Sequence, residues 1–531
     1  MRPAFFDFRH DIILNFNYSY YSPLGHVALN PDNIKLVFGL KIKQLRLDRA
    51  LSLNDLSQKS GLSISYINEI EKGKKYPKAD KIISLAHALG TDYDSLVSLK
   101  LSKRLEPISE LLSSNILTEL PLDIFGIDQS NLLEMLSDAP TKVSAFIGTL
   151  IEISRNYNMS VEQFYFSALR TYQEMHDNYF EEIENAAEQF LSEKGVDGSF
   201  ILDEAYLIAV LRKTYNYEIE QIDKIAHPEL KAVRSLTIPQ PGGPRLLVNG
   251  SLTPVQKSFI YGREIGYQYL KLNNRLYTTS VLEADSFEQL LNNFKASYFA
   301  SAIIIRRSLL IPKLKEFFNL KIWQPEQLLG MIDHFNTTPE SFSYRVSNIL
   351  PKHFGINQIF FLRFNNFAGQ NKFELTKEMH IARKHIPHSV KDEHYCRRWL
   401  SLTILQDLAE QNQETKNPVN TLCKAQISKY ADSGEEYLMV SFAKSSLNSP
   451  NPNVSVSMGI FLNEDSRKII GFLNDPDLRL RLVNETCERC TLFDCKERMA
   501  APTVLQRRHK NEELKKRIAT LLNSKLNSVS L

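Results

Sequence analysis

The spacing of apolar residues predicts a chain that is helical at its start and rich in strands toward its end. Apolar side chains recur with the helical period from Ile34 to Asp48 and from Leu53 to Lys59. Segments between 101 and 231 keep that period. After Pro351 the pattern alternates, as in QIFFLRF, EEYLMVSFA and NVSVSMGIFL, with one helix near RRWLSLTILQDLAEQ. We therefore predict a multidomain α+β fold, with an all-α N-terminal domain, a helical middle and a C-terminal α/β domain.

A glycine and a serine mark a tight turn before a third short helix. Gly61 ends the second helix, and Ser63 stands at the N-cap of a helix that runs through Ile67 and Ile70 to Gly73. The two isoleucines are expected to face inward. Polar residues remain on the outer side or near the helix start, where they suit base edges and phosphates. These candidate DNA-binding residues are Ser63, Ser65, Tyr66, Asn68, Glu69, Lys72, Lys74 and Lys75.

Length and composition indicate a globular chain of several domains. The 531 residues exceed the length at which one hydrophobic core stops growing, about 250 residues, so two to four domains are expected. With 43% apolar and 24% charged residues, wholesale disorder is excluded. Five cysteines do not suggest a secreted disulfide framework, and no apolar stretch reaches the roughly 18 residues of a membrane helix. We expect a cytoplasmic protein that does not span a membrane.

The charge is unevenly distributed. Between Ile34 and Arg104 there are fourteen Lys and Arg against seven Asp and Glu, a local net charge of +7. Because the formal net charge of the whole chain is +3, the remainder carries about −4. A basic segment on a near-neutral protein is typical of a nucleic-acid-binding module. Charge alone would equally allow a solvated helical face.

The segment containing SGLSISYINEIEKG, followed by Pro77 and LAHALG, resembles the XRE (Cro/C1-type) helix-turn-helix family over about 65 residues. The resemblance implies that the third helix, Ser63 to Lys72, docks in the major groove of double-stranded DNA. One position departs from the family pattern: Leu53 stands where a glutamine usually faces DNA. The alternative is a relic module or a protein-docking surface.

A second resemblance concerns RLLVNGSLTPVQKSFIYGREIGYQYL, which is similar to the zinc-peptidase-like ImmA/IrrE family. In that family the helix carries H-E-x-x-H, with two zinc ligands and a general base. Here Arg263, Glu264 and Tyr267 occupy those positions, and Lys295 stands at the third-ligand position. A guanidinium, a phenol and an ammonium do not hold zinc. We therefore predict a degenerate peptidase site, no catalytic residue and no enzyme activity.

Two alternatives remain for this helix. Arg263 and Lys295 put cations where the metal charge stood, so Glu264 either forms a structural ion pair or lies beside an anion pocket. An active zinc metallopeptidase that cleaves a partner repressor is the competing function. Further upstream, an acidic run near Glu174, Asp177, Glu181, Glu182 and Glu184, with His176, suggests a solvated helix face rather than a metal site.

Three cysteines close to the C-terminus form the last candidate site. Cys487, Cys490 and Cys495 fall within nine residues, which matches the local reach of a structural zinc or iron–sulfur loop. Cys396 is the best fourth donor and His394 the second. A metal-sensing or redox-sensing regulator using these cysteines is therefore a further alternative, as are packed thiols without metal.

The end of the chain also resembles the C-terminal domain of bacterial short-chain fatty-acyl regulators. Their C-x-x-C…DC-x-x-R-x-A-P signature matches Cys487, Cys490, Asp494, Cys495, Arg498, Ala500 and Pro502, with Cys396 and Trp399 upstream and Arg397 in place of a proline. The resemblance implies an effector-responsive regulator of central carbon or fatty-acid metabolism, with an acyl-CoA as a possible small-molecule effector and a homodimer on palindromic DNA.

These observations divide the chain into consecutive parts. A basic amphipathic helix at the end is expected to pack on the core or to support dimerisation. The predicted parts are an extension at 1–30, the helix-turn-helix domain at 31–104, a helical connector at 105–230, the degenerate ImmA/IrrE-like domain at 231–345, a sensor-like domain with the cysteine cluster at 346–502 and the basic tail at 503–531.

Overall fold

The chain forms two compact units, Met1–Val161 and Glu162–Leu531. A computed structural model describes residues 31–98, 161–198, 200–222, 229–230, 233–278, 284, 286–367, 372–380, 393–414, 421–445 and 452–527. The extension at 1–30 and the helices expected between 101 and 160 lie outside these ranges. Within them, no helix combines the length and apolar character needed to cross a membrane.

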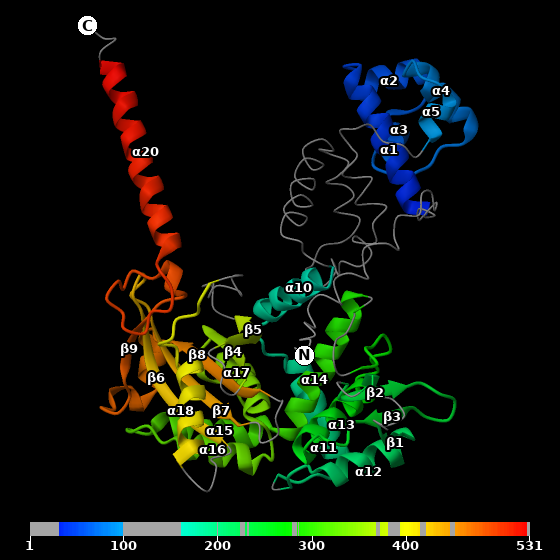
Figure 1. The fold of residues 1–531 in the computed structure, drawn as a ribbon. Helices are drawn as coiled ribbons and strands as arrows, with labels where there is room; N and C mark the ends of the chain where they lie inside the picture. The colour runs from blue at the N-terminus through cyan, green and yellow to red at the C-terminus, as the bar shows by residue number, and fades with distance from the viewer. Residues whose placement is uncertain are drawn as a thin grey trace, which may run out of the picture. The chain divides into compact units, whose positions relative to one another are not determined.

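The described part of the first unit consists only of helices (Figure 1). They are α1 (Pro31–Asp48), α2 (Leu53–Ser60), α3 (Ile64–Glu71), α4 (Ala79–Ala88) and α5 (Tyr93–Val97). Their apolar faces meet in one core that includes Phe38, Ile42, Leu56, Ile67 and Ile70. The helices predicted from spacing are therefore present, and the inward placement of both isoleucines is confirmed.

A glycine lets two of these helices approach closely. A Cβ atom at Gly39 of α1 would lie 2.1 Å from the carbonyl oxygen of Ile70 in α3. Since Cβ atoms do not come so close to backbone oxygens, only glycine fits here. Gly39 thereby sets the position of α3.

The second unit begins with helices and a small three-stranded sheet (Figure 1). The sheet has the order β1-β3-β2, with β1 parallel and β2 antiparallel to β3. Its strands are β1 (Glu218–Gln221), β2 (Ser235–Ile238) and β3 (Arg245–Val248). The helices are α10 (Val161–Met175), α11 (Glu181–Glu193), α12 (Glu204–Tyr215), α13 (Pro254–Tyr269), α14 (Phe287–Ile304), α15 (Arg307–Asn319), α16 (Pro325–His334) and α17 (Pro339–Phe354).

The segment RLLVNGSLTPVQKSFIYGREIGYQYL forms strand β3, a turn and helix α13. Thr253 caps α13 in a capping box with Gln256, and Pro254 occupies the first turn. α13 packs tightly on α14, because a Cβ atom at Gly266 would lie 2.9 Å from the carbonyl oxygen of Ala296. Thr253 and Pro254, which are visible in the sequence, therefore mark where α13 begins.

Residues 161–195 lie in the region expected to be helical, and they form two helices, α10 and α11. Asp177 and Asn178 adopt positive φ values of 48° and 54°, which end a helix. Asn178 is buried and donates to the hydroxyl of Ser347, while its carbonyl accepts from Asn348. Contacts with α17, distant in sequence, thus stabilise a break that local periodicity did not predict.

The C-terminal part of the second unit is built on a six-stranded sheet with the order β5-β4-β8-β7-β6-β9. All neighbouring strands are antiparallel except β6 and β9. The strands are β4 (Ile359–Asn366), β5 (Phe373–His380), β6 (Thr421–Tyr430), β7 (Glu436–Lys444), β8 (Asn453–Phe461) and β9 (Leu480–Val483). The chain is therefore mixed α/β, with a helical N-terminal part and a C-terminal part rich in β-sheet, as predicted.

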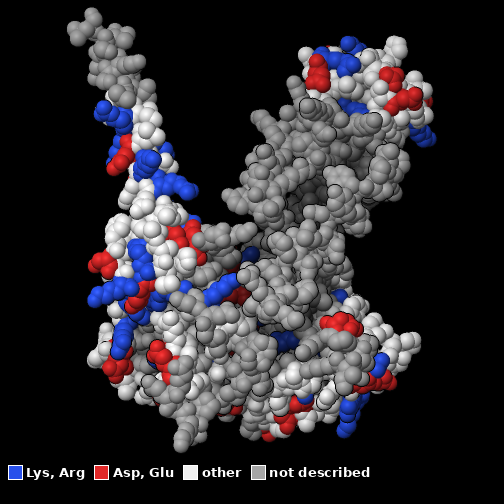
Figure 2. All heavy atoms as spheres, viewed as in Figure 1, with Lys and Arg blue, Asp and Glu red and all other residues white. Residues whose placement is uncertain are grey.

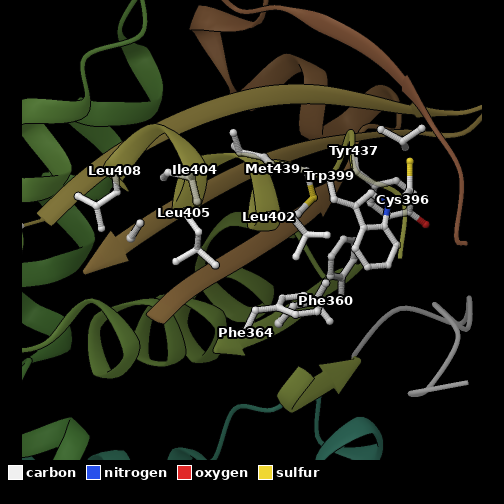
Figure 3. Close-up of a cluster of buried hydrophobic side chains, with 14 residues drawn as sticks. Phe360, Phe364, Cys396, Trp399, Leu402, Ile404, Leu405, Leu408, Tyr437 and Met439 are labelled. Atoms are coloured by element: carbon white, nitrogen blue, oxygen red, sulfur yellow. The ribbon is translucent and has the colours of Figure 1, made fainter. Parts of the chain in front are cut away.

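Helix α18 (Leu400–Glu414) covers this sheet and closes its core. Figure 3 shows Leu402, Leu405 and Leu408 of the helix beside Phe360 and Met439 of the sheet. Trp399, just before α18, donates its indole N–H to the carbonyl oxygen of Asn484 at 2.8 Å. The remaining short elements are α19 (Glu464–Ile469), η3 (Gly471–Asn474) and η4 (Cys487–Arg489), and the chain ends in α20 (Thr503–Asn527).

Candidate nucleic-acid interface and the sites of the second unit

The turn between α2 and α3 has the geometry expected from its glycine and serine. Gly61 is left-handed, with φ 70°, and its N–H donates to Ser57. Ser63 caps α3 by accepting the backbone N–H of Tyr66 at 3.2 Å. Because Ile67 and Ile70 are fully buried beneath it, α3 can present only its opposite face.

That opposite face carries the predicted DNA-binding residues. Ser65 and Asn68 are exposed, and Tyr66, Glu69 and Lys72 are half-buried at its edges. These side chains offer hydroxyl and amide groups, which can donate to and accept from base edges. Ser63, Lys74 and Lys75 lie exposed at the two ends of the helix.

Lys75, one of the residues predicted to contact phosphate, forms an ion pair within the chain. The Lys75 ammonium lies 2.7 Å from a Glu69 carboxylate oxygen and 5.8 Å from the centre of the Tyr66 ring. The hydrogen bond that Lys75 donates to Glu69 is the largest cause of a raised Lys75 pKa, and the negative charge of the same carboxylate adds to the rise. Exposed pairs of this kind are weak, so a phosphate can replace the carboxylate at little cost.

A buried ion pair, which the sequence reasoning missed, fixes the end of α3. Arg46 of α1 donates to both carboxylate oxygens of Glu71 at 2.7 and 2.9 Å, and to the carbonyl of Leu51 at 2.9 Å. The hydrogen bond with Glu71 is the largest cause of a raised Arg46 pKa. Their separation by 25 positions gives no local signal. Leu53 packs partly against the same core, which accounts for an apolar residue at this otherwise polar position.

Comparison with known proteins agrees with this geometry. A helix-turn-helix family model, HTH_3, matches residues 42–96. The control protein C.BamHI of Bacillus amyloliquefaciens is 34% identical over 67 residues, covering 12% of this chain and 83% of the relative. This chain belongs to the XRE-type helix-turn-helix family. The matched residues form a DNA-binding helix-turn-helix of the type found in transcriptional regulators.

Two further likenesses reach beyond the helix-turn-helix. The propionyl-CoA carboxylase regulator of Cereibacter sphaeroides is 22% identical over 179 residues, 30% of this chain. This chain matches only 37% of that relative's length. A solved structure of a Mycobacterium tuberculosis transcriptional regulator covers 64% of this chain and 93% of its own, at 18% identity and a TM-score of 0.44.

In the second unit, the helix resembling a peptidase motif is α13, and its central residues are buried. Arg263, Glu264 and Tyr267 have exposed fractions of 2%, 0% and 2%. The Tyr267 hydroxyl donates to the amide oxygen of Asn293 at 3.1 Å, and Arg263 approaches the same oxygen at 3.5 Å. Lys295 is half-buried on α14 and makes no hydrogen bond or ion pair with any residue that the structure describes. The α14 residue that contacts Arg263 and Tyr267 is therefore Asn293 and not Lys295.

Glu264 is held in an ion pair whose main partner the sequence reasoning did not find. Arg275 donates to both carboxylate oxygens at 2.8 and 2.7 Å and lies 3.9 Å from the centre of the Tyr267 ring. Tyr217 donates to Glu264 at 3.1 Å, while Arg263 is 3.4 Å away. Burial alone would raise the pKa of Glu264, but the charges of Arg275 and Arg263 and the hydrogen bonds outweigh it and lower the pKa. The carboxylate is therefore ionised and engaged.

The acidic run from Glu174 to Glu184 was expected to be a solvated helix face, and Glu184 on α11 departs from that expectation. The Glu184 carboxylate is buried and accepts two hydrogen bonds from Arg345 of α17. It also accepts a hydrogen bond from the Tyr298 hydroxyl at 2.7 Å. Arg345 is buried too, so the two charges neutralise each other. By contrast Glu174, Asp177, Glu181 and Glu182 are exposed, as is His176.

Three of the four candidate cysteines come together. Cys396, Cys487 and Cys490 are buried. Burial raises the pKa of Cys396 to about 11, although two backbone hydrogen bonds lower it. The neighbouring Cys490 and Cys487 add to the rise. The backbone connects them as well, since Cys487 N–H donates to the carbonyl oxygen of His394 at 2.8 Å. Cys495 is half-buried, and no described contact joins it to the others. Among the described residues no group of three His, Cys, Asp or Glu side chains is arranged to hold a metal ion.

The loop that carries Cys487 and Cys490 is organised by one arginine. Arg498 donates to the carbonyl oxygens of Cys487, Cys490, Leu492 and Ala500 at 2.6 to 3.2 Å. The loop's backbone also turns N–H groups toward sulfur: Leu492 donates to Cys490 Sγ at 3.4 Å and Met499 to Cys487 Sγ at 3.3 Å. These contacts fix the position of both sulfur atoms relative to the backbone of the loop. His394 instead pairs with Glu488 at 2.7 Å.

Proposed function

We propose that this regulator responds to a small-molecule effector and inserts α3 into the major groove as a homodimer on palindromic DNA. The observation that carries the proposal is the polarity of α3, with two isoleucines fully buried and Ser65 and Asn68 exposed on the outer face. Helix-turn-helix dimers place two such helices about one turn of DNA apart.

Sequencing the genomic fragments that the full chain retains tests this proposal. The wild-type chain should enrich fragments that share one palindromic sequence. Asn68→Ala should relax the base preference at one position in each half-site, whereas the exposed Lys81→Ala on α4 should leave the motif unchanged. Identical motifs for the wild type and a Ser65→Ala, Asn68→Ala variant would show that α3 does not read bases.

The effector that we propose is a short-chain acyl-CoA, with target genes in central carbon or fatty-acid metabolism. This rests on the resemblance to short-chain fatty-acyl regulators and on a relative named a propionyl-CoA carboxylase regulator. DNA affinity should change on adding propionyl-CoA and stay constant on adding propionate. Equal affinity with and without propionyl-CoA would exclude this effector.

The peptidase-like region is proposed to be catalytically inactive. A general base must be free to accept a proton from water, but the Glu264 carboxylate is fully buried and bound by Arg275 and Tyr217. Zinc that co-purifies and is lost on Tyr267→Phe, or proteolysis of a partner repressor abolished by Glu264→Gln, would establish the peptidase instead.

For the cysteines we propose that a structural zinc or an iron–sulfur cluster binds Cys396, Cys487 and Cys490 only with a rearrangement of the loop that brings in Cys495 as the fourth donor, because no group of three donors in the described residues is arranged to hold an ion. The support is the proximity of three thiols and the N–H groups directed at two of them. Such a group would tie the loop to the start of α18. Metal content should fall in Cys490→Ser and persist in Cys423→Ser, a buried cysteine on β6. No metal in the wild-type chain would favour packed thiols.

A further inference from the structure

The final helix, α20, extends from the C-terminal part of the second unit with little support. Figure 1 shows it running away from the six-stranded sheet. Leu505 in its first turn is buried, while every residue from 506 to 520 is exposed. The expectation that this helix packs on the core therefore holds only for its first turn. A helix that lacks packing is marginal in water, so a partner is needed to stabilise it.

The charges of α20 are strongly one-sided. Six Lys and Arg and two Glu lie between Arg507 and Arg517, a net charge of +4 over eleven residues. None of the six forms a hydrogen bond or ion pair with a side chain that the structure describes. Figure 2 shows basic atoms in blue along this helix, with few acidic atoms in red among them. These residues, the α20 cations, are Arg507, Arg508, Lys510, Lys515, Lys516 and Arg517.

Charge distinguishes between the available partners. A second copy of α20 would bring another +4 alongside, so pairing of two identical helices is opposed by like-charge repulsion. Within the described residues, the charge of Arg508 reaches Glu485 and slightly offsets the rise that burial causes in the pKa of that carboxyl group. The cations farther along the helix are offset only in part, by Glu512 and Glu513. The helix therefore fits a polyanion outside the chain.

We propose that α20 is a second DNA-contacting element, which holds backbone phosphates without reading bases. Once the helix-turn-helix has bound, DNA is the polyanion present at high effective concentration for any tethered basic helix. DNA carries one negative charge per about 1.7 Å of its axis, so a helix with six exposed cations can neutralise several phosphates. The contact adds affinity and leaves specificity to α3.

The exposed apolar residues Leu514 and Ile518 lie four positions apart on one face of α20. They give the helix a narrow apolar stripe between its cations. An acidic groove on another protein would bury that stripe, so this partner is the competing outcome of the experiment.

The experiment measures the affinity of the full chain for a 40-base-pair duplex of arbitrary sequence as a function of salt. Neutralising Arg507, Arg508, Lys515 and Lys516 to Gln keeps helix propensity, since Gln resembles Lys and Arg in this respect. The control neutralises four exposed lysines elsewhere in the second unit: Lys213, Lys315, Lys321 and Lys444.

The α20 variant should flatten the log–log salt slope by up to about 0.9 for each phosphate that the helix no longer neutralises, while the control keeps the wild-type slope. Far-ultraviolet circular dichroism checks that the helix remains. A slope equal to that of the wild type, or an equal decrease in the control, would overturn the proposal. Lys72 and Lys74 stay intact in both variants, so a failure here leaves the role of α3 untouched.

Discussion

Glu264 and Glu71 illustrate how single buried carboxylates shape this protein. Each is paired with an arginine through two short hydrogen bonds, Glu264 with Arg275 and Glu71 with Arg46. Removing one partner of such a pair leaves a charge buried without compensation, which costs about 3 to 5 kcal/mol. The pairs therefore make their surroundings intolerant of single substitutions.

Arg275→Met should destabilise the second unit by about 3 to 5 kcal/mol, because Glu264 keeps its burial and loses its main partner. The effect should also depend on pH. The pKa of Glu264 is below its ordinary value of 4.5 in the folded chain, so the pair stabilises fully above that value and loses its contribution as pH falls through the folded pKa. Urea unfolding at several pH values measures the loss of stability and its dependence on pH.

In that experiment the double variant Glu264→Gln, Arg275→Met serves as the control, since it removes the charge as well as its partner. It should be more stable than Arg275→Met alone near neutral pH. Equal stabilities for the two variants would mean that Glu264 is not charged in the folded protein.

Gly39→Ala tests the close approach of α1 and α3. The added methyl would collide with the Ile70 carbonyl, so the two helices must separate, at a cost of about 1 to 3 kcal/mol. Thermal unfolding should therefore occur earlier, and DNA affinity should fall because α3 moves. Gly330→Ala is the matched change, with open space around its Cβ and no positive φ. Equal stabilities for both variants would contradict the packing.

At the level of elements, local signals predicted what depends on neighbours in sequence. The caps at Ser63 and Thr253, the turn at Gly61 and the strands β4, β7 and β8 all follow from short-range patterns. The break after α10 did not, because it depends on Ser347 and Asn348 of a distant helix. Strands β5, β6 and β9 were not singled out from the sequence, and since β6 lies inside the sheet, position at an edge does not account for this.

Arg498 organises the loop that carries Cys487 and Cys490, because its side chain donates hydrogen bonds to four carbonyl oxygens of that loop. Arg498→Ala frees four carbonyl oxygens, and hydrogen bonds to a charged group contribute about 1.5 to 3 kcal/mol each before non-additivity. The loop should loosen, and Cys487 and Cys490 should react with a thiol reagent at least several-fold faster. Arg467→Ala, which breaks an exposed pair with Glu436, should not change the rate. Unchanged reactivity in Arg498→Ala would rule out this role.

Across the whole molecule, charge is concentrated at two places along the sequence. The helix-turn-helix region and the end of the chain are basic, while the remainder is acidic, with a net charge of about −9 outside 34–104 and 503–531. The overall value of +3 conceals this arrangement. An acidic remainder opposes unspecific attachment to DNA, so contact is restricted to the elements that carry the cations.

The sequence predicted only those parts of the sites whose residues are neighbours along the chain. Motif spacing identified α3 and the two loop cysteines, because their residues are neighbours in sequence. Arg275, Asn293 and the meeting of Cys396 with Cys487 depend on how separate segments fold together, and no short-range pattern encodes that. The missing histidines of α13 were visible in the sequence, but the ion pair that engages Glu264 was not.

The salt dependence of DNA binding tests the central claim, that α3 and its flanking lysines form the DNA interface, most directly. For a full-length chain and a genomic fragment that it retains, Lys72→Ala with Lys74→Ala should reduce the log–log slope by up to about 1.8, or about 0.9 for each phosphate contact. The paired Lys315→Ala and Lys321→Ala change on the second unit should leave it unaltered. A slope identical to that of the wild type in the Lys72, Lys74 variant would contradict the account.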